Sequence, residues 1–193
     1  MNAKARLNPF PGLRSFEPDE DYLFFGREKQ VDDLLGRLRR TRFLAVVGGS
    51  GSGKSSLVKS GLMPSLRSGY MAKAGSSWRV ALLRPGADPI GNLASALNDP
   101  AVLGGDAAMD EFSGALLGAS LRRSGQGLVD VLREARLPPD ENVLVVVDQF
   151  EELFRFKQAR ADAGGRDEAV AFVKLLLEAA RQDDIPIYIV LTM

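Results

Sequence analysis

The 193-residue sequence predicts an α/β fold, a three-layer sandwich in which a mainly parallel sheet lies between two layers of helices. Two observations predict it. Short apolar runs alternate along the chain with longer segments whose apolar residues recur at helical spacing, as a parallel sheet with crossover helices requires. One apolar run, 43–47, also leads directly into a glycine-rich turn and a further helical segment.

The expected strands are short apolar runs bounded by turn residues. The run at 143–147 contains five apolar residues in succession, which is typical of a strand that is buried on both faces of a sheet. Strands are expected at 43–47, 78–83, 143–147 and 185–192.

The expected helices show apolar residues three or four positions apart, together with recognisable ends. Asp88 followed by Pro89 predicts a helix start, because Asp is a good cap and Pro suits the first helical position. Pro64 is expected to stop the helix after the glycine-rich turn, and residues 159–166 are expected to form a polar loop. Helices are expected at 27–40, 55–63, 90–97, 109–121, 127–137, 150–157 and 167–182.

The composition excludes several kinds of chemistry. The chain has no histidine and no cysteine, so a Ser-His triad, a histidine base, a His-ligated metal and thiolate metal sites are excluded. Any proton transfer must therefore use Asp, Glu, Lys or Tyr. Lys and Arg total 25 and Asp and Glu total 25, so no overall field favours nucleic acid or an anionic membrane. No signal peptide or membrane-spanning apolar run is recognised, so we expect a cytoplasmic protein without a membrane segment.

Residues 48–55 read GGSGSGKS and match the phosphate-loop (P-loop) pattern G-x-x-x-x-G-K-[ST], which predicts a P-loop NTPase fold. Glycines let successive backbone N–H groups curl around an anion, and the following helix adds its positive end. Lys54 is expected to reach the β- and γ-phosphates, and the Ser55 hydroxyl to ligate Mg²⁺. The alternative is a flexible Gly/Ser loop. The residues expected to bind ATP or ADP here are Gly48, Gly49, Ser50, Gly51, Ser52, Gly53, Lys54, Ser55 and Ser56.

A second motif follows the buried run at 143–147. Asp148 stands where P-loop enzymes place an acid that holds Mg²⁺ beside the loop serine. Glu151 and Glu152 follow at three and four positions, and one of them is a candidate base for the attacking water, with Lys54 stabilising charge on the phosphoryl group. For Asp148 the alternative is a solvent-facing turn residue. For the two glutamates it is a pair of acids that complement a helix dipole.

Four segments resemble a known family: 11–16, 24–28, 43–58 and 147–154. They look like the bacterial novel STAND NTPase group, the signal-transduction ATPases with numerous domains, which are relatives of the NACHT and AAA+ ATPases. The P-loop is common to all such ATPases, whereas the segments FFGRE (24–28) and DQFEELF (148–154) are more specific. The resemblance covers the chain from about Pro9 onward.

The resemblance implies an ATP-driven switch that works with other protein domains or subunits of a larger signalling assembly. It implies that Asp148 is the metal acid, that Glu151 and Glu152 are the downstream acidic pair, and that Phe25, Gly26 and Arg27 line the adenine pocket. A hydrophobic staple into the next helix is the alternative for this last segment. Residues 1–26 are then an extended linker on the adenine side, and residues 27–193 the ATPase core.

Family members usually continue beyond Thr192 into an arginine-containing sensor and a strand that flanks the P-loop strand. We therefore expect a C-terminally truncated core, with 43–47 as an open edge strand that is prone to associate.

Two function classes remain open. The first is an Mg-ATP-binding switch domain with weak or partner-dependent ATP hydrolysis, which we prefer. The second is a nucleotide-dependent interaction module without significant hydrolysis. A GTPase is disfavoured because no Asn-Lys-x-Asp guanine-reading motif occurs. The P-loop alone also suits a small-molecule kinase, although no acceptor site is recognised.

Overall fold

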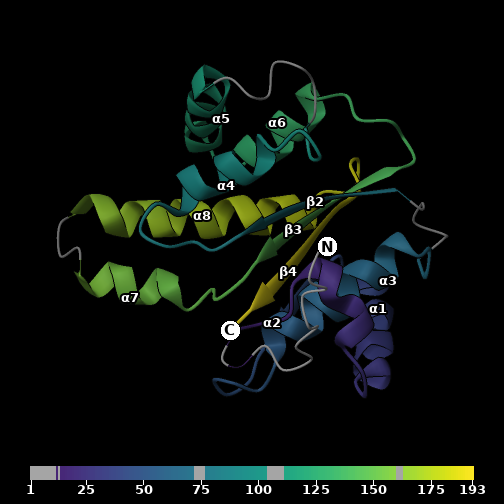
Figure 1. Cartoon of the computed structure of the whole chain (residues 1–193). Coiled ribbons are helices and arrows are strands. Elements are labelled where there is room, and N and C mark those ends of the chain that lie inside the picture. The colour runs from purple at the N-terminus through teal and green to yellow at the C-terminus, as the bar shows by residue number, and fades with distance from the viewer. Residues whose placement is uncertain (1–11, 13, 72–76, 104–110, 160–162) are drawn as a thin grey trace, which may run out of the picture.

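Four parallel strands form the centre of the molecule in the order β1-β4-β3-β2 (Figure 1). The computed structural model describes residues 12, 14–71, 77–103, 111–159 and 163–193. The strands are β1 (Phe43–Val46), β2 (Ser77–Leu83), β3 (Glu141–Val147) and β4 (Ile187–Thr192). All four lie within about two residues of the expected bounds, because apolar runs bounded by turn residues are a direct signal for buried strands.

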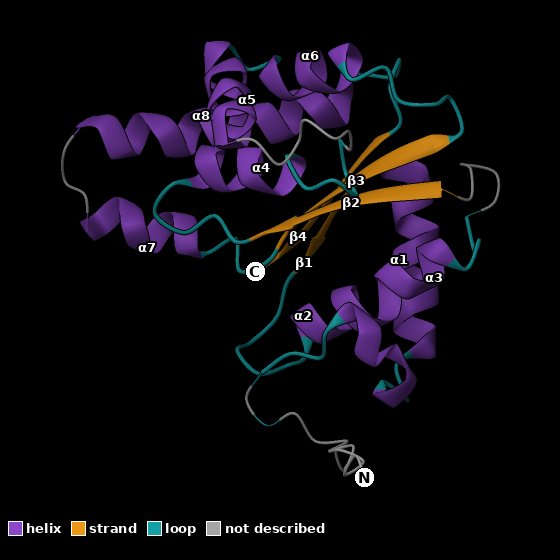
Figure 2. Ribbon diagram, turned by 45° about the horizontal axis from the view of Figure 1, so that its top comes forward, coloured by secondary structure: helices purple, strands orange, loops and turns teal. Residues whose placement is uncertain are grey.

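Helices cover both faces of the sheet, so the predicted three-layer α/β fold is confirmed (Figures 1 and 2). One layer contains α1 (Glu28–Thr41) and a continuous helical segment made of α2 (Lys54–Ser56), η2 (Leu57–Leu62) and α3 (Met63–Arg67). The other layer contains α4 (Pro89–Leu97), α5 (Glu111–Arg123), α6 (Gly127–Glu134) and α8 (Ala163–Arg181). A 3₁₀-helix, η1 (Pro18–Leu23), precedes α1, and α7 (Glu152–Ala159) follows β3.

Alternate residues of each strand serve two separate cores, as the pleat of a strand requires. In β3, Val143, Val145 and Val147 pack beneath α4, α6 and α8, whereas Leu144 and Val146 pack against α1 and η2. All five are fully buried. The prediction that 143–147 is buried on both faces is therefore confirmed.

The prediction that Pro64 ends the helix after the P-loop is wrong. The chain widens into a π-helix over η2, in which the N–H of Met63 bonds to the carbonyl of Val58, and it then continues as α3. Pro64 lies in the first turn of α3. The helix thus passes through Pro64 directly after the π-helical segment.

Three further boundaries differ from the sequence expectations. Helix α8 begins at Ala163, so most of the loop expected at 159–166 is helical, although residues 160–162 lie outside the described residues. Helix α7 begins at Glu152 because Gln149 has a left-handed backbone with φ of 59°. Helix α6 ends at Glu134, and Arg136 is likewise left-handed with φ of 49°. The two left-handed residues are not glycines, so their positive φ could not be predicted from residue type.

Strand β1 is the outermost strand of the described sheet on one side. Its outer neighbour position is open among the residues that the structure describes, and Val47, directly after it, is 67% exposed. Residues 43–46 thus form an edge strand of the described sheet, and the tendency of this edge to associate stays a prediction. On its other side β1 pairs with β4, and Met193 extends this pairing by one residue. The N–H of Met193 bonds to the carbonyl of Val46, and the N–H of Gly48 bonds to the carbonyl of Met193.

Candidate functional site

The P-loop connects β1 to α2 at the carboxyl ends of the strands. Gly51 and Gly53 have φ of 75° and 84°, a conformation that glycine adopts without a steric penalty. The N–H of Ser52 bonds to the carbonyl of Gly49, which tightens the turn, and the N–H of Leu57 bonds to the carbonyl of Gly53, which begins the helix. The loop is therefore an ordered turn that leads into a helix N-terminus, and not a flexible Gly/Ser linker.

Lys54 folds back over this loop. Its Nζ donates hydrogen bonds to the carbonyls of Gly48, at 2.8 Å, and Gly49, at 2.9 Å. These two bonds hold the ammonium group above the turn whose N–H groups are expected to meet the phosphates. A phosphate that enters the loop would exchange two neutral carbonyl partners for a charged one, and charge-assisted hydrogen bonds are stronger.

Ser55, Asp148 and Thr192 meet where α2, β3 and β4 approach one another. Asp148 directly follows β3 and is only 2% exposed. Its Oδ1 accepts hydrogen bonds from Ser55 Oγ at 2.6 Å and from Thr192 Oγ1 at 2.7 Å. Thr192 Oγ1 also accepts the N–H of Gln149 at 3.0 Å. The two residues proposed from the sequence as metal ligands, 93 positions apart, thus lie in direct contact.

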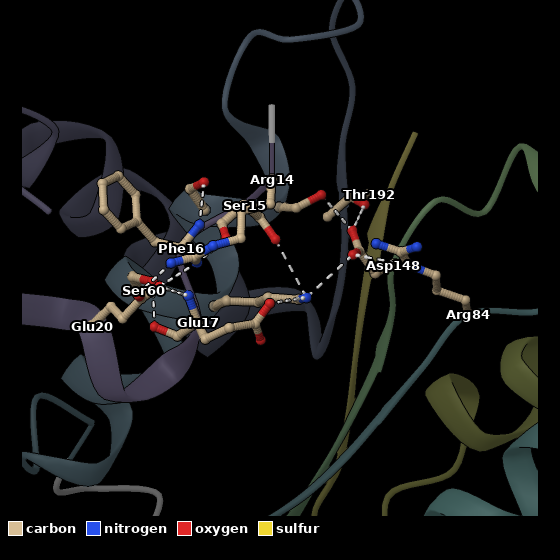
Figure 3. A network of polar contacts seen from close by, with 12 residues as sticks. Arg14, Ser15, Phe16, Glu17, Glu20, Ser60, Arg84, Asp148 and Thr192 are labelled. Atoms are coloured by element: carbon tan, nitrogen blue, oxygen red, sulfur yellow. Dashed lines mark hydrogen bonds and ion pairs between the residues drawn. The ribbon is translucent and has the colours of Figure 1, made fainter. Parts of the chain in front are cut away.

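The second oxygen of Asp148, Oδ2, is buried and has no hydrogen-bond partner among the residues that the structure describes. Two cations lie just beyond hydrogen-bond distance (Figure 3): Lys59 Nζ at 3.6 Å and Arg84 Nε at 3.7 Å. An unpaired carboxylate oxygen in the interior is costly, and nearby positive charge offsets part of that cost. Oδ2 is thus a free acceptor in a positively charged surrounding.

The segment before α1 packs against the helix that follows the P-loop (Figure 3). The N–H of Phe16 bonds to Ser56 Oγ at 3.1 Å, and Ser60 Oγ bonds to the carbonyl of Glu17 at 2.8 Å. Lys59, which is 7% exposed, reaches the carboxylate of Glu17 at 3.3 Å and Ser15 Oγ at 3.4 Å. Lys59 therefore lies between the N-terminal segment and Asp148.

Of the three consecutive residues expected at the adenine pocket, only Arg27 lines a cavity. Arg27 donates from Nη2 to the carbonyl of Ser52 in the P-loop, at 3.4 Å, and lines a cavity of about 380 Å³ between η1, α1 and α3. Phe24 and Glu28 line the same cavity. Phe25 is 76% exposed and, like Gly26, is not part of the lining. Gly26 instead makes the turn into α1, with φ of 81°.

The comparison with known families agrees with this geometry. The sequence model of the family Novel STAND NTPase 1 matches residues 9–193, nearly the whole chain. The chain belongs to this family. This match confirms the resemblance that the sequence analysis identified. STAND NTPases are nucleotide-binding NTPases of signalling proteins. Searches of curated proteins and of solved structures give no match. No helix in the described part of the chain is long and apolar enough to cross a membrane.

The two acids that follow Asp148 in this STAND NTPase chain have different surroundings. Glu152 Oε2 accepts the N–H of Gly86 at 3.3 Å, from the loop after β2. Glu151 Oε2 is buried and has no hydrogen-bond partner among the described residues. Both side chains are partly buried. Both acids therefore keep a carboxylate oxygen that accepts no hydrogen bond from the described residues, as a general base requires.

The residues present also fit a magnesium ion. No group of three or more His, Cys, Asp or Glu side chains in the described residues forms a metal cage. Mg²⁺ does not need one, because it is usually held by one or two protein oxygens together with waters and substrate phosphates. The Ser55 hydroxyl, the adjacent Asp148 carboxylate and the unsatisfied Oδ2 supply the expected kind of ligand set.

Sequence reasoning missed Lys59 and Arg84. A signal for Lys59 was present, since it is the one charged residue in the mainly apolar helical stretch 57–63. No local signal marked Arg84. It lies beside Asp148 because β2 pairs with β3, and that pairing cannot be read from residues 84–86 alone.

Proposed function

We propose that this chain is the Mg-ATP-binding switch domain of a STAND-type signalling ATPase, with weak or partner-dependent hydrolysis. The observation that carries the proposal is the hydrogen bond of 2.6 Å between Ser55 Oγ and Asp148 Oδ1 beneath an ordered P-loop. This pairing of the loop serine with the acid at the end of a buried strand is the arrangement that P-loop NTPases use for magnesium and phosphate.

In this proposal the P-loop N–H groups and the N-terminus of α2 hold the phosphates. Lys54 leaves the carbonyls of Gly48 and Gly49 and contacts the β- and γ-phosphates. Ser55 and Asp148 hold Mg²⁺, whose positive charge offsets that of the phosphate oxygens. Ser56 packs behind the loop and fixes residues 14–17 through its bond to the N–H of Phe16.

We assign residues 1–26 as the linker on the adenine side and residues 27–193 as the ATPase core, whose first residue, Arg27, also belongs to the adenine side. Arg27 supports this assignment, because it bonds to the P-loop carbonyl of Ser52 and also lines the adjacent cavity. Gly26 and the exposed Phe25 are proposed to contact the base from the turn before α1. The choice of ATP or ADP as ligand, other domains or subunits as partners, and a cytoplasmic location remain predictions from the sequence.

Glu151 is assigned as the general base. It takes a proton from the attacking water as the water oxygen bonds to the γ-phosphorus. The bond from phosphorus to the β–γ bridging oxygen then breaks, and ADP leaves with that electron pair. Lys54 offsets the negative charge that shifts to the bridging oxygen.

Slow turnover is supported by the positions of the two acids. One oxygen of Glu151 is buried, and Glu152 is bonded to the N–H of Gly86. Both side chains are only partly exposed, and in this proposal hydrolysis speeds up when a partner stabilises a movement of residues 149–152 that opens them further to water. Without such a movement the chain acts as a nucleotide-dependent interaction module, which is the second candidate.

Single-turnover hydrolysis with Mg²⁺ and excess protein tests the choice. A switch ATPase converts bound ATP to ADP within the lifetime of the experiment, slowly in the isolated chain. An interaction module binds ATP and releases it intact. Failure to bind ATP or ADP at all would reject both candidates.

A further inference from the structure

Arg84 is the one residue beside Asp148 that combines a fixed backbone with a side chain free of hydrogen bonds in the described part of the chain. It directly follows β2, which pairs in parallel with β3, and the N–H of Asp148 bonds to the carbonyl of Leu83 at 2.8 Å. Ligands of parallel α/β sheets bind at the carboxyl ends of the strands. Arg84 thus stands at the ligand edge, next to the proposed magnesium acid (Figure 3).

The backbone of Arg84 is anchored by α4. Asn92 Nδ2 donates to the carbonyl of Arg84 at 3.2 Å and to the carbonyl of Pro85 at 3.0 Å. The guanidinium itself makes no hydrogen bond to any residue that the structure describes, and the side chain is 54% exposed. A guanidinium carries five N–H donors in a planar fork that matches phosphate oxygens. Arg84 therefore presents unused donors from a fixed position.

Asp148 does not depend on Arg84 for its place. Its Oδ1 already has two hydrogen bonds, from Ser55 and Thr192. The charge near Oδ2 is also supplied by Lys59, which is buried and tethered to Glu17 and Ser15. Of the two cations, Lys59 is fixed in place and Arg84 is able to move to another anion.

We propose that Arg84 binds the terminal phosphate of a bound nucleoside triphosphate, so that the site distinguishes the triphosphate from the diphosphate. This inference rests on the proposed function. The P-loop N–H groups contact phosphates that ADP also has, and Lys54 is shared between the β- and γ-phosphates, whereas Arg84 approaches from β2, across Asp148, and meets the γ-phosphate alone. Arg84 gains hydrogen bonds only when a γ-phosphate is present, and such a gain raises the affinity for ATP without raising that for ADP.

The test compares Arg84→Gln with the wild type and with Arg133→Gln. Arg133 is a matched control, since its side chain is also 54% exposed and lies in surface ion pairs with Asp130 and Asp184. Affinities for ADP and for the non-hydrolysable β,γ-imido analogue of ATP are measured by calorimetry, with Mg²⁺ and again with EDTA. Circular dichroism melting verifies that each variant is folded.

We expect Arg84→Gln to lower the affinity for the triphosphate by about 10- to 100-fold, the usual range for a charge-assisted contact, and to leave ADP affinity within about twofold. The loss should persist in EDTA, Arg84→Lys should retain part of the preference, and Arg133→Gln should change nothing. Equal losses for both nucleotides, no loss, or a loss confined to Mg²⁺ would each overturn the inference.

The outcomes also separate this inference from the proposed function. If Arg84→Gln changes nothing while Lys54→Ala abolishes binding of both nucleotides, the P-loop site stands and only the role of Arg84 fails. If the wild type binds neither nucleotide, both fail together.

Discussion

At the scale of single residues, the site is built around the two unlike oxygens of Asp148. Oδ1 is fully used by the hydroxyls of Ser55 and Thr192, and Oδ2 is free between two cations. Because one oxygen is fixed by neutral donors, the carboxylate keeps its orientation when the other takes a new partner. The family match identifies the kind of domain. In the proposed function, the free oxygen of Asp148 is the one that would hold a metal beside the P-loop.

Asp148 and Glu151 should be separable by mutation. Asp148→Asn is expected to weaken Mg²⁺-dependent nucleotide binding, because the amide carries no charge for the metal. Glu151→Gln should keep binding and slow hydrolysis by about 10²- to 10⁴-fold, the usual contribution of a general base. Calorimetry with and without Mg²⁺ measures the first effect and single-turnover kinetics the second. A larger hydrolytic loss in Glu152→Gln would reverse the assignment within the acidic pair.

At the scale of elements, the helix after the P-loop is fitted closely against its neighbours. Gly61, in η2, lies so near α1 that an added Cβ would stand 2.7 Å from Val31 Cγ2 and 3.2 Å from Phe24 Cε1. Phe24 and Val31 belong to the wall of the cavity between η1, α1 and α3. Contact at Gly61 therefore couples the N-terminal segment to the helix that carries Lys54 and Ser55.

Gly61→Ala should destabilise the protein by about 1–3 kcal/mol, because the extra methyl overpacks this contact. Gly36→Ala is the matched control, since Gly36 lies in α1 and an added Cβ there meets nothing within 4 Å. That change should be neutral or stabilising by about 0.5–1 kcal/mol, because glycine costs that much inside a helix. Urea unfolding measures both. Equal effects in the two variants would contradict the close fit of η2 against α1.

The N-terminal segment should be sensitive to acid. Hydrogen bonds from Arg14 and from the N–H of Glu17 lower the pKa of Glu20 from 4.5 to about 2. A lowered pKa in the folded state gives stability that is complete above about pH 4.5 and is lost as the pH falls towards 2. Glu20→Gln should thus lower the melting temperature slightly at pH 7 and not at pH 2. Glu134→Gln is the control for the substitution itself, because Glu134 is an exposed helix residue without a hydrogen bond or ion pair among the described residues, and it should leave the melting temperature at pH 7 unchanged.

How far the sequence predicts each element depends on how local its determinants are. The strands, the Asp88 cap and the P-loop were predicted because apolar runs, cap residues and glycines act within a few positions; the Asp88 side chain does accept the N–H of Gly91. The passage of the helix through Pro64 was not predicted, because it follows a π-helical segment that no local residue pattern signals. Arg84 was missed because only the sheet order places it beside Asp148.

At the scale of the whole molecule, three distant parts of the chain converge on one carboxylate. The P-loop helix brings Ser55, the end of β4 brings Thr192, and the N-terminal segment reaches it through Lys59. Nucleotide binding should therefore stiffen the molecule as a unit. At a nucleotide concentration 100 times its Kd, the free energy of unfolding should rise by about 2.7 kcal/mol, which thermal melting detects. Melting unchanged by Mg·ATP at such a concentration would contradict nucleotide binding to the folded chain.

The most direct test of nucleotide binding at the P-loop is calorimetric titration of Mg·ATP into the wild type and into Lys54→Ala. The wild type should bind at micromolar concentrations. The variant should lose binding in that range, because a charge-assisted phosphate contact contributes about 10- to 100-fold in affinity. Equal affinity in the two proteins would show that the P-loop is not the phosphate site, and the absence of binding in the wild type would contradict the proposed function itself.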